Sequence, residues 1–167
     1  MTPQQRLESL NLALPAAPKA AGLYKPALVV DRLVYLSGHL PLLADGSLMR
    51  GCVGRDLDAD GGKQAARLVA LAMLATLVAA LGSLDRVHRL VKLLGTVNCT
   101  PDFEKHPHVI NGASEVFAEI WGPDHGVGAR SAVGMSSLPM GVPVEIEAVF
   151  ELRGVAAAPG ETPGKTR

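Results

Sequence analysis

Cysteine is scarce in this chain, which has only Cys52 and Cys99 among its 167 residues. Two cysteines cannot form the disulfide framework of a small secreted protein, so we expect free thiols in a reducing compartment, the cytoplasm. Residues 1–8 are polar and lack the apolar core of a signal peptide. The longest apolar run, residues 68–81, falls short of a membrane span, so we expect no membrane partner.

Net charge is absent too, since 16 basic residues balance 16 acidic ones. A neutral chain has no general attraction to phosphate backbones, and an aromatic content of 4% leaves few side chains on which bases can stack. We therefore expect no nucleic-acid partner. The sequence also lacks the Gly-x-Gly-x-x-Gly pattern and a phosphate-binding loop, and we expect no cofactor.

Two clusters of potential metal ligands lack the spacing of a metal site. The segment His106-Pro107-His108 has no cysteine pair or acidic third ligand at a recognisable spacing, and we interpret it as a polar loop before a helix. Asp56, Asp58 and Asp60 precede two glycines but lack the closing glutamate of an EF-hand. Their negative charge suits the start of a helix, so no metal site is expected.

Apolar residues, in contrast, make up 48% of the chain, and the mean hydropathy is +0.23. A chain of this length forms one domain, and one small domain cannot bury so much apolar surface internally. We therefore expect burial between subunits. We interpret residues 1–22 as an Ala/Pro-rich lead-in, residues 23–153 as the domain, and the Gly/Pro/Ala-rich residues 154–167 as a disordered tail.

Hydrophobic periodicity predicts an α+β fold. A helix at residues 62–81 is apolar nearly all round, so we expect it to be buried against the sheet on one side and against a partner on another. The other predicted elements are a hairpin at 27–37, a short edge strand at 49–57, a strand at 87–97, a helix at 108–121, and two strands within 129–151 joined by a turn at 138–141. This order predicts two layers, one sheet with two helices on one face.

Arg130 lies on the first of the two C-terminal strands, beside a floor of small residues. Side chains alternate along a strand, so Arg130 shares its face with Ala132 and Gly134. A guanidinium with room above the sheet can grip a planar anion through paired hydrogen bonds, which indicates a carboxylate site. The alternative is an arginine that lies on the surface or in an ion pair.

The second C-terminal strand separates an apolar face, which includes Val144 and Ile146, from an acidic face with Glu145 and Glu147. Either carboxylate could act beside the arginine. Two like charges this close tend to raise the pKa of one of them. The sequence leaves open which of the two faces the site.

Together these residues resemble the signature of the RidA/YjgF family. The matching elements are Arg130-Ser131, Leu138-Pro139 and Glu145-Ile146-Glu147-Ala148, at the spacing of the family. That family, often labelled endoribonuclease L-PSP, consists of small trimeric enamine/imine deaminases. The resemblance implies a chorismate-mutase-like fold, with a mixed sheet and two helices packed on one face, and a homotrimer with its sites between subunits.

The resemblance also implies a set of site residues. Arg130 would hold the carboxylate of the substrate, and Glu145 would lie near the hydrolytic water. The residues that correspond to the family's substrate-binding pocket are Tyr24, Ser37, Gly38, Asn111 and Ala132.

Two positions depart from the family pattern. Ala132 stands where many members have a cysteine, so no thiol can act there, although the backbone amide of Ala132 could still contact a carboxylate. His39 replaces the usual glutamine. It places a group that titrates near neutrality beside the pocket, the alternative being a histidine that packs its ring at a strand end.

The reaction implied by the resemblance is hydrolysis of a small 2-imino or 2-enamino carboxylate to a 2-keto acid and ammonia. Imines hydrolyse unaided, so positioning, one polarising donor and one proton acceptor suffice. The alternative is a non-catalytic module that binds a small carboxylate in the arginine pocket. Endoribonuclease activity is a third candidate, but neutral charge and few aromatic residues argue against it.

Overall fold

The computed structural model describes residues 1–154, so all but the first residue of the expected disordered tail lies outside it. The elements are α1 (Pro3–Ser9), β1 (Ala27–Val30), β2 (Leu33–His39), α2 (Ala59–Leu81), η1 (Leu84–Arg86), β3 (Val87–Asn98), α3 (His106–Trp121), α4 (Pro123–Gly126), β4 (Ala129–Met135), η2 (Pro139–Gly141) and β5 (Val144–Leu152). The hairpin, the two long helices and the three later strands of the sequence analysis are all present.

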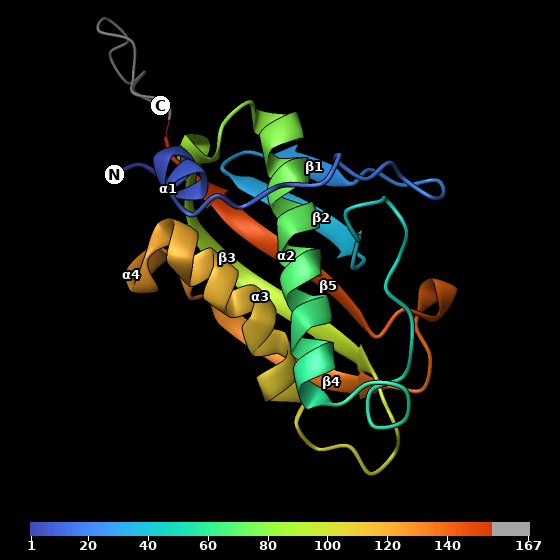
Figure 1. Cartoon of the computed structure of the whole chain (residues 1–167). Coiled ribbons are helices and arrows are strands. Elements are labelled where there is room, and N and C mark those ends of the chain that lie inside the picture. The colour runs from blue at the N-terminus through green and yellow to red at the C-terminus, as the bar shows by residue number, and fades with distance from the viewer. Residues whose placement is uncertain (155–167) are drawn as a thin grey trace, which may run out of the picture.

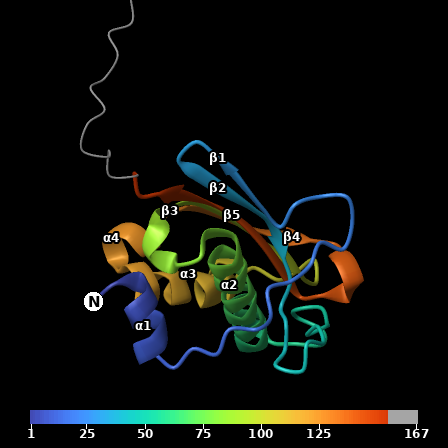
Figure 2. The same cartoon turned by 90° about the horizontal axis from the view of Figure 1, so that it is seen from above.

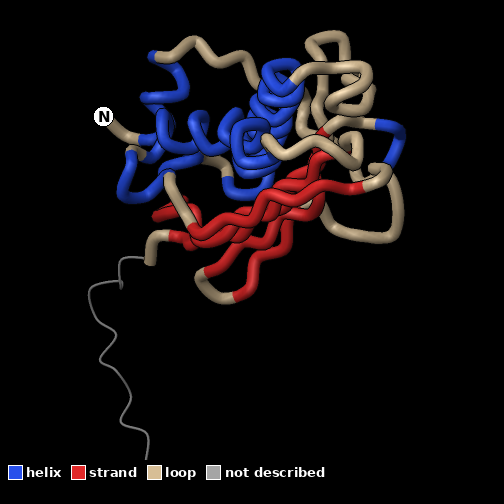
Figure 3. The backbone as a smooth tube through the Cα atoms, turned by 90° about the horizontal axis from the view of Figure 1, so that it is seen from below, coloured by secondary structure: helices blue, strands red, loops and turns tan. Residues whose placement is uncertain are grey.

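The five strands form one mixed sheet in the order β1-β2-β5-β3-β4. All neighbours are antiparallel except β3 and β4, which run parallel. Figures 1 and 2 show α2 and α3 on one face of this sheet, and Figure 3 shows the strands as a separate layer with the opposite face uncovered. This arrangement confirms the predicted α+β architecture with two helices on one face.

The strand order separates β4 from β5, although a short connection through η2 joins them in the sequence. β3 lies between them and pairs with both. Arg130 is therefore on an edge strand, whereas Glu145 lies on a strand inside the sheet. Arg130 and Glu145 are therefore on different strands that do not pair with each other.

The predicted edge strand at 49–57 was wrong. This segment is a loop that makes only isolated bridges, from Val53 to Leu57 and to Cys99. Gly51 and Gly54 have φ angles of 132° and 91°, which interrupt any extended strand there. A Cβ at Gly54 would also overlap Thr100, so the loop lies close against the end of β3.

The helix α2 begins three residues earlier than predicted, because Asp58 caps it. The Asp58 carboxylate accepts a 2.7 Å hydrogen bond from the Gly61 amide, and Gly82, with φ 83°, ends the helix. By length and composition alone α2 could cross a membrane, but 61% of its most apolar window is buried inside the fold. Its apolar residues pack with those of α3 and of the sheet in one buried core.

The lead-in covers the outer side of the helix layer. Figures 1 and 2 show the segment after α1 running across α2 on the side away from the sheet before it turns back to β1. Leu7 is buried in the core, and Leu12 and Leu14 pack against it. The Gln4 amide donates a 2.8 Å hydrogen bond to Asp85, which fixes α1 near η1. The second buried side of α2, for which we expected a partner, is thus covered by α3 and by this chain's own N-terminal segment.

Candidate functional site

Arg130 is held against the helix layer by three groups of α3. Its register partner on β3 is Leu93, which is fully buried, so the Arg130 side chain leaves the sheet on the helix side. Nη1 donates to Asn111 Oδ1 at 2.8 Å and to Ser114 Oγ at 3.0 Å, and Nη2 donates to the Pro107 carbonyl at 3.4 Å. These contacts fix the guanidinium in one orientation.

The space beside Arg130 is not where the sequence predicted it. The small residues Ala132 and Gly134 allow α3 to approach: Ala132 packs against the core, and a Cβ at Gly134 would come within 2.6 Å of His106 Nε2. The floor of small residues is therefore covered by helix. A recess of about 340 Å³ opens beside the arginine instead, lined by Leu90, Leu93, Asn111, Ser114, Val127, Gly128 and Arg130.

A β-bulge in β2 forms the second part of the candidate site. Leu36 pairs with Ala148 and His39 pairs with Ile146, so Ser37 and Gly38 together lie opposite one residue of β5. A Cβ at Gly38 would overlap the carboxylate of Glu145. The Glu145 side chain therefore lies directly over Gly38, and only glycine leaves room for it.

Backbone contacts hold the walls around Glu145. The Ser37 hydroxyl donates a 2.7 Å hydrogen bond to the Lys25 carbonyl, and the Ala21 amide donates a 3.1 Å hydrogen bond to the Tyr24 hydroxyl. A recess of about 360 Å³ lies here, lined by Ala21, Gly22, Tyr24, Ser37, Gly38, Leu40, Pro139, Met140 and Glu145. Tyr24, Ser37, Gly38 and Glu145 are thus brought together as the sequence analysis expected.

Glu145, and not Glu147, lines this recess. Glu145 is half-buried, and Glu147 is exposed in a separate groove on the open face of the sheet. Burial raises the pKa of Glu145, and the neighbouring charge of Glu147 raises it further. A carboxylate with a raised pKa is a better proton acceptor, which suits it to activate water.

His39 is buried and hydrogen-bonded at both ring nitrogens. The residue is 4% exposed, and its ring has Nδ1 2.6 Å from the Ser37 carbonyl and Nε2 2.8 Å from the Thr76 hydroxyl. A neutral ring satisfies both contacts if Nδ1 donates to the carbonyl and Nε2 accepts from the hydroxyl. Burial lowers the pKa of His39, so the packed-ring alternative is the one observed.

The two potential metal clusters are divided among other contacts. His106 Nε2 lies 3.3 Å from Cys99 Sγ, whereas His108 Nε2 lies 2.7 Å from Asp60 Oδ1. Asp58 caps α2, as its position before the helix predicted. Within residues 1–154, no three His, Cys, Asp or Glu side chains come together as potential metal ligands.

The candidate residues therefore form two groups on opposite faces of the sheet. The arginine group, Arg130 with Asn111 and Ser114, lies on the helix side at the β4 edge. The glutamate group, Glu145 with Tyr24, Ser37 and Gly38, lies on the open face of the sheet, where β5 pairs with β2. Figure 1 shows β3 between β5, which carries Glu145, and β4, which carries Arg130. Within one chain, the sheet separates the two groups.

The fold and this divided set of residues define a member of the YjgF/chorismate mutase-like family, and the chain belongs to it. The family model that matches residues 4–143 is described as "YjgF/chorismate mutase-like, putative endoribonuclease". The matched range begins inside α1, so most of the lead-in is part of the family match.

Named relatives support this membership. Protein TCP17 of Trypanosoma cruzi is 40% identical over 87% of this chain and 91% of its own. The crystal structure of Atu1372 from Agrobacterium tumefaciens, a protein of unknown function, is 39% identical, covers 90% of this chain and 92% of its own, and has a TM-score of 0.80. The crystal structure of RidA from an Antarctic Psychrobacter is 30% identical, with coverages of 81% and 93% and a TM-score of 0.57.

Sequence reasoning missed two parts of the site. Ser114 contacts Arg130 and lies three residues after Asn111, so the helical repeat could have placed it beside Asn111. Met140 reaches the glutamate group from η2, where it adopts a φ of 56°. No local pattern predicts that contact, because it depends on how the η2 connection lies over the end of β2.

Proposed function

We propose that this protein hydrolyses 2-imino or 2-enamino carboxylates to 2-keto acids and ammonia. In this proposal it acts as a homotrimer in the cytoplasm, with the arginine group of one subunit and the glutamate group of the next forming each site. The observation that carries the proposal is the division itself: two preorganised groups with complementary roles lie on opposite faces of the sheet, and a second copy of the chain can complete each one.

The open face of the sheet supports association between copies. Its large apolar side chains are 42–45% exposed at Leu28, Tyr35, Val133 and Met135. Within residues 1–154 no element covers them, and Figure 3 shows that side of the sheet bare. Exposed apolar side chains on an uncovered sheet face are typical of an interface, because their burial removes apolar surface from water.

The chemistry follows from the two groups. Arg130 would bind the substrate carboxylate through its guanidinium, which Asn111 and Ser114 already orient. Glu145 would accept a proton from water as the water oxygen attacks the C=N carbon. As the C–O bond forms, Glu145 would pass this proton to the former imine nitrogen, which gives a carbinolamine. The hydroxyl proton would then move through Glu145 to the nitrogen, and the C–N bond would break as the C=O bond forms, which releases ammonia and the 2-keto acid. Oxidation states are conserved, so no redox partner is needed.

A non-catalytic carboxylate-binding module is the second candidate, and Ala132 is the observation that favours it. Where a thiol is expected from the family resemblance, this chain has a methyl group packed against the core. Endoribonuclease activity, which the family description includes, is the weaker candidate. The chain has a net charge of +0, and the recess between β2 and β5 carries the carboxylate of Glu145, which repels phosphate.

The test supplies 2-aminoacrylate from serine with a pyridoxal-dependent dehydratase and measures the release of pyruvate. We expect the wild type to accelerate release and Arg130→Ala to lower kcat/KM about ten- to a hundredfold, the value of a charged hydrogen bond. Arg55→Ala, at an exposed arginine paired with Asp56, is the matched control. No acceleration by the wild type would sink the enzyme proposal, and an Arg130-dependent melting shift with 2-ketobutyrate would then support the binding module.

A further inference from the structure

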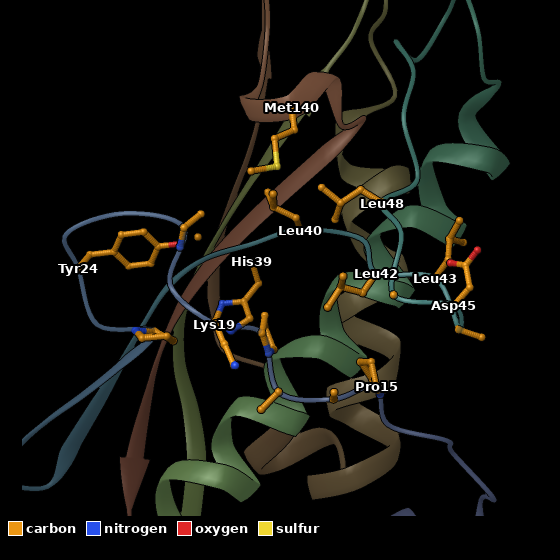
Figure 4. A pocket seen from close by; sticks show the side chains of 18 residues that line it. Pro15, Lys19, Tyr24, His39, Leu40, Leu42, Leu43, Asp45, Leu48 and Met140 are labelled. Carbon is orange, nitrogen blue, oxygen red and sulfur yellow. The ribbon is translucent and has the colours of Figure 1, made fainter.

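A second cavity adjoins the recess at Glu145. It measures about 670 Å³ and lies between the lead-in, from Pro15 to Ala21, and the loop of residues 40–48 (Figure 4). Figure 4 shows Leu40, Leu42 and Leu48 around this space, with Met140 at one end. We call it the lead-in cavity. The family's catalytic positions do not require it, because Arg130 and Glu145 lie outside its walls.

The walls of the lead-in cavity are mainly apolar. Charged side chains come only from Lys19 and Asp45 among its described lining residues. The Asp45 carboxylate is already bound to the amide and the hydroxyl of Ser47, at 2.9 and 2.6 Å. His39 contributes a neutral ring, because both its nitrogens are bonded and burial lowers its pKa. Such a wall favours an apolar occupant over a charged one.

The lead-in cavity borders the recess that contains Glu145. Both are lined by Ala21, Tyr24, Gly38, Leu40 and Met140. A side chain that extends from a C=N carbon at Glu145 past Tyr24 would therefore enter the lead-in cavity. The smallest 2-imino acids would leave the cavity unused, since they carry only a methyl or methylene group at that position.

We propose that the physiological substrates are 2-imino acids with a bulky apolar side chain, branched aliphatic or aromatic, which occupies the lead-in cavity. This inference rests on the proposed function for the identity of the reacting group. Burial of the side chain in an apolar cavity removes it from water, which raises affinity for the larger acid over the smaller one. The lead-in thus selects the substrate, while the sheet carries the reacting groups.

The test uses 2-keto acids, the products of the reaction, as unreactive probes of the full-length protein in calorimetry. The probes are 2-ketobutyrate, 4-methyl-2-oxopentanoate, phenylpyruvate and 2-oxoglutarate. We expect the two apolar acids to bind the wild type at least about tenfold more tightly than 2-ketobutyrate, and 2-oxoglutarate to gain no such advantage. Equal binding of the apolar acids and 2-ketobutyrate, or tightest binding of 2-oxoglutarate, would overturn the inference.

Two variants that fill the cavity sharpen the test. Leu48→Trp fills it from the loop, and Ala17→Phe fills it from the exposed lead-in, where a larger side chain does not disturb the core. Each should abolish the preference for the apolar acids. Leu10→Trp, on an exposed leucine after α1, is the control and should keep the preference. A preference that persists in both filled variants would place the side chain elsewhere.

Turnover measurements separate this inference from the proposed function. An L-amino acid oxidase with catalase supplies imines from leucine or phenylalanine, and semicarbazide competes for them. If the apolar keto acids bind tightly but the imines are not hydrolysed faster, the proposed reaction fails and the cavity assignment stands. If every imine is hydrolysed faster but the filled variants keep their preference for large ones, the reaction stands and the cavity assignment fails.

Discussion

The arginine group and the glutamate group differ in how completely this chain already satisfies them. Arg130 has three hydrogen-bond partners on α3, so its position is fixed before any ligand arrives. Glu145 lies over Gly38 and is half-buried. Among the described residues, no group donates a hydrogen bond to its carboxylate. A binding residue gains from a fixed orientation, whereas a proton acceptor must keep its lone pairs free.

The largest effect is expected when the arginine group and the glutamate group are inactivated on different chains, which tests whether two subunits share each site. Arg130→Ala and Glu145→Gln should each abolish most activity alone. Mixed trimers that contain both variants should recover about a third of wild-type activity, because one of their three shared sites combines an intact arginine with an intact glutamate. The measurement is kcat per site after co-expression and tandem-tag purification. Activity that stays at the level of the single variants would mean that one chain supplies both groups.

A smaller change displaces only the glutamate. In Gly38→Ala the new Cβ would overlap the Glu145 carboxylate, which lies at the end of a flexible side chain and can move aside. We expect kcat/KM to fall about a hundredfold, as for a misplaced catalytic group, while the melting temperature changes little. Gly154→Ala, where a Cβ meets nothing within 4 Å, serves as the control. Full activity in Gly38→Ala would show that the Glu145 carboxylate does not take part in the reaction.

The pH dependence tests the electrostatics of the glutamate group. Glu145 acts as a carboxylate, so activity should be lost as pH falls through its pKa, which burial and then Glu147 raise above 4.5. Glu147→Gln removes the second cause and leaves the first. The acidic limb of the kcat/KM profile should move to lower pH without reaching the value of an exposed glutamate, and the plateau should not change. An unmoved limb would show that another group controls it.

The smallest expected effect is on stability, at the floor of the glutamate group. Burial lowers the pKa of His39 below 6.5, so the folded state binds its proton less readily than the unfolded state. Its contribution to stability is present above pH 6.5 and is lost as pH falls below that value. In His39→Gln, which keeps an amide between Ser37 and Thr76, the melting temperature should fall less between pH 7 and pH 5, by a few degrees. Parallel curves for the two proteins would argue against this assignment.

Most of the fold could be predicted from the sequence because its signals are local. The apolar repeat of α2 and the alternation of β5, with Val144 and Ile146 inward and Glu145 outward, predicted both elements and their faces. The order of the strands could not be predicted, because no local pattern reports that β3 lies between β4 and β5. Arg130, Glu145 and the pocket residues matched to the family were therefore identifiable, but the contact of Met140 and the division into two groups were visible only in three dimensions.

The predicted free space above the small residues beside Arg130 was wrong for a related reason. Small residues at 132 and 134 were interpreted as free space, but a floor of small residues also permits a helix to pack closely, and α3 does so. His39 shows the reverse case. Its type suggested titration, and only its burial between Ser37 and Thr76 revealed a structural role. Composition constrains what a residue can do, and packing determines which alternative occurs.

The lead-in offers a route by which this scaffold can diversify. It crosses the helix layer as a strap anchored at α1 and at β1, and between these anchors the residues that line the cavity, such as Ala16, Ala17 and Lys19, are exposed. Replacements there would reshape the cavity without touching the strands that carry Arg130 and Glu145. Evolution, or a protein engineer, can therefore vary selectivity in a short N-terminal segment while the reacting groups stay constant.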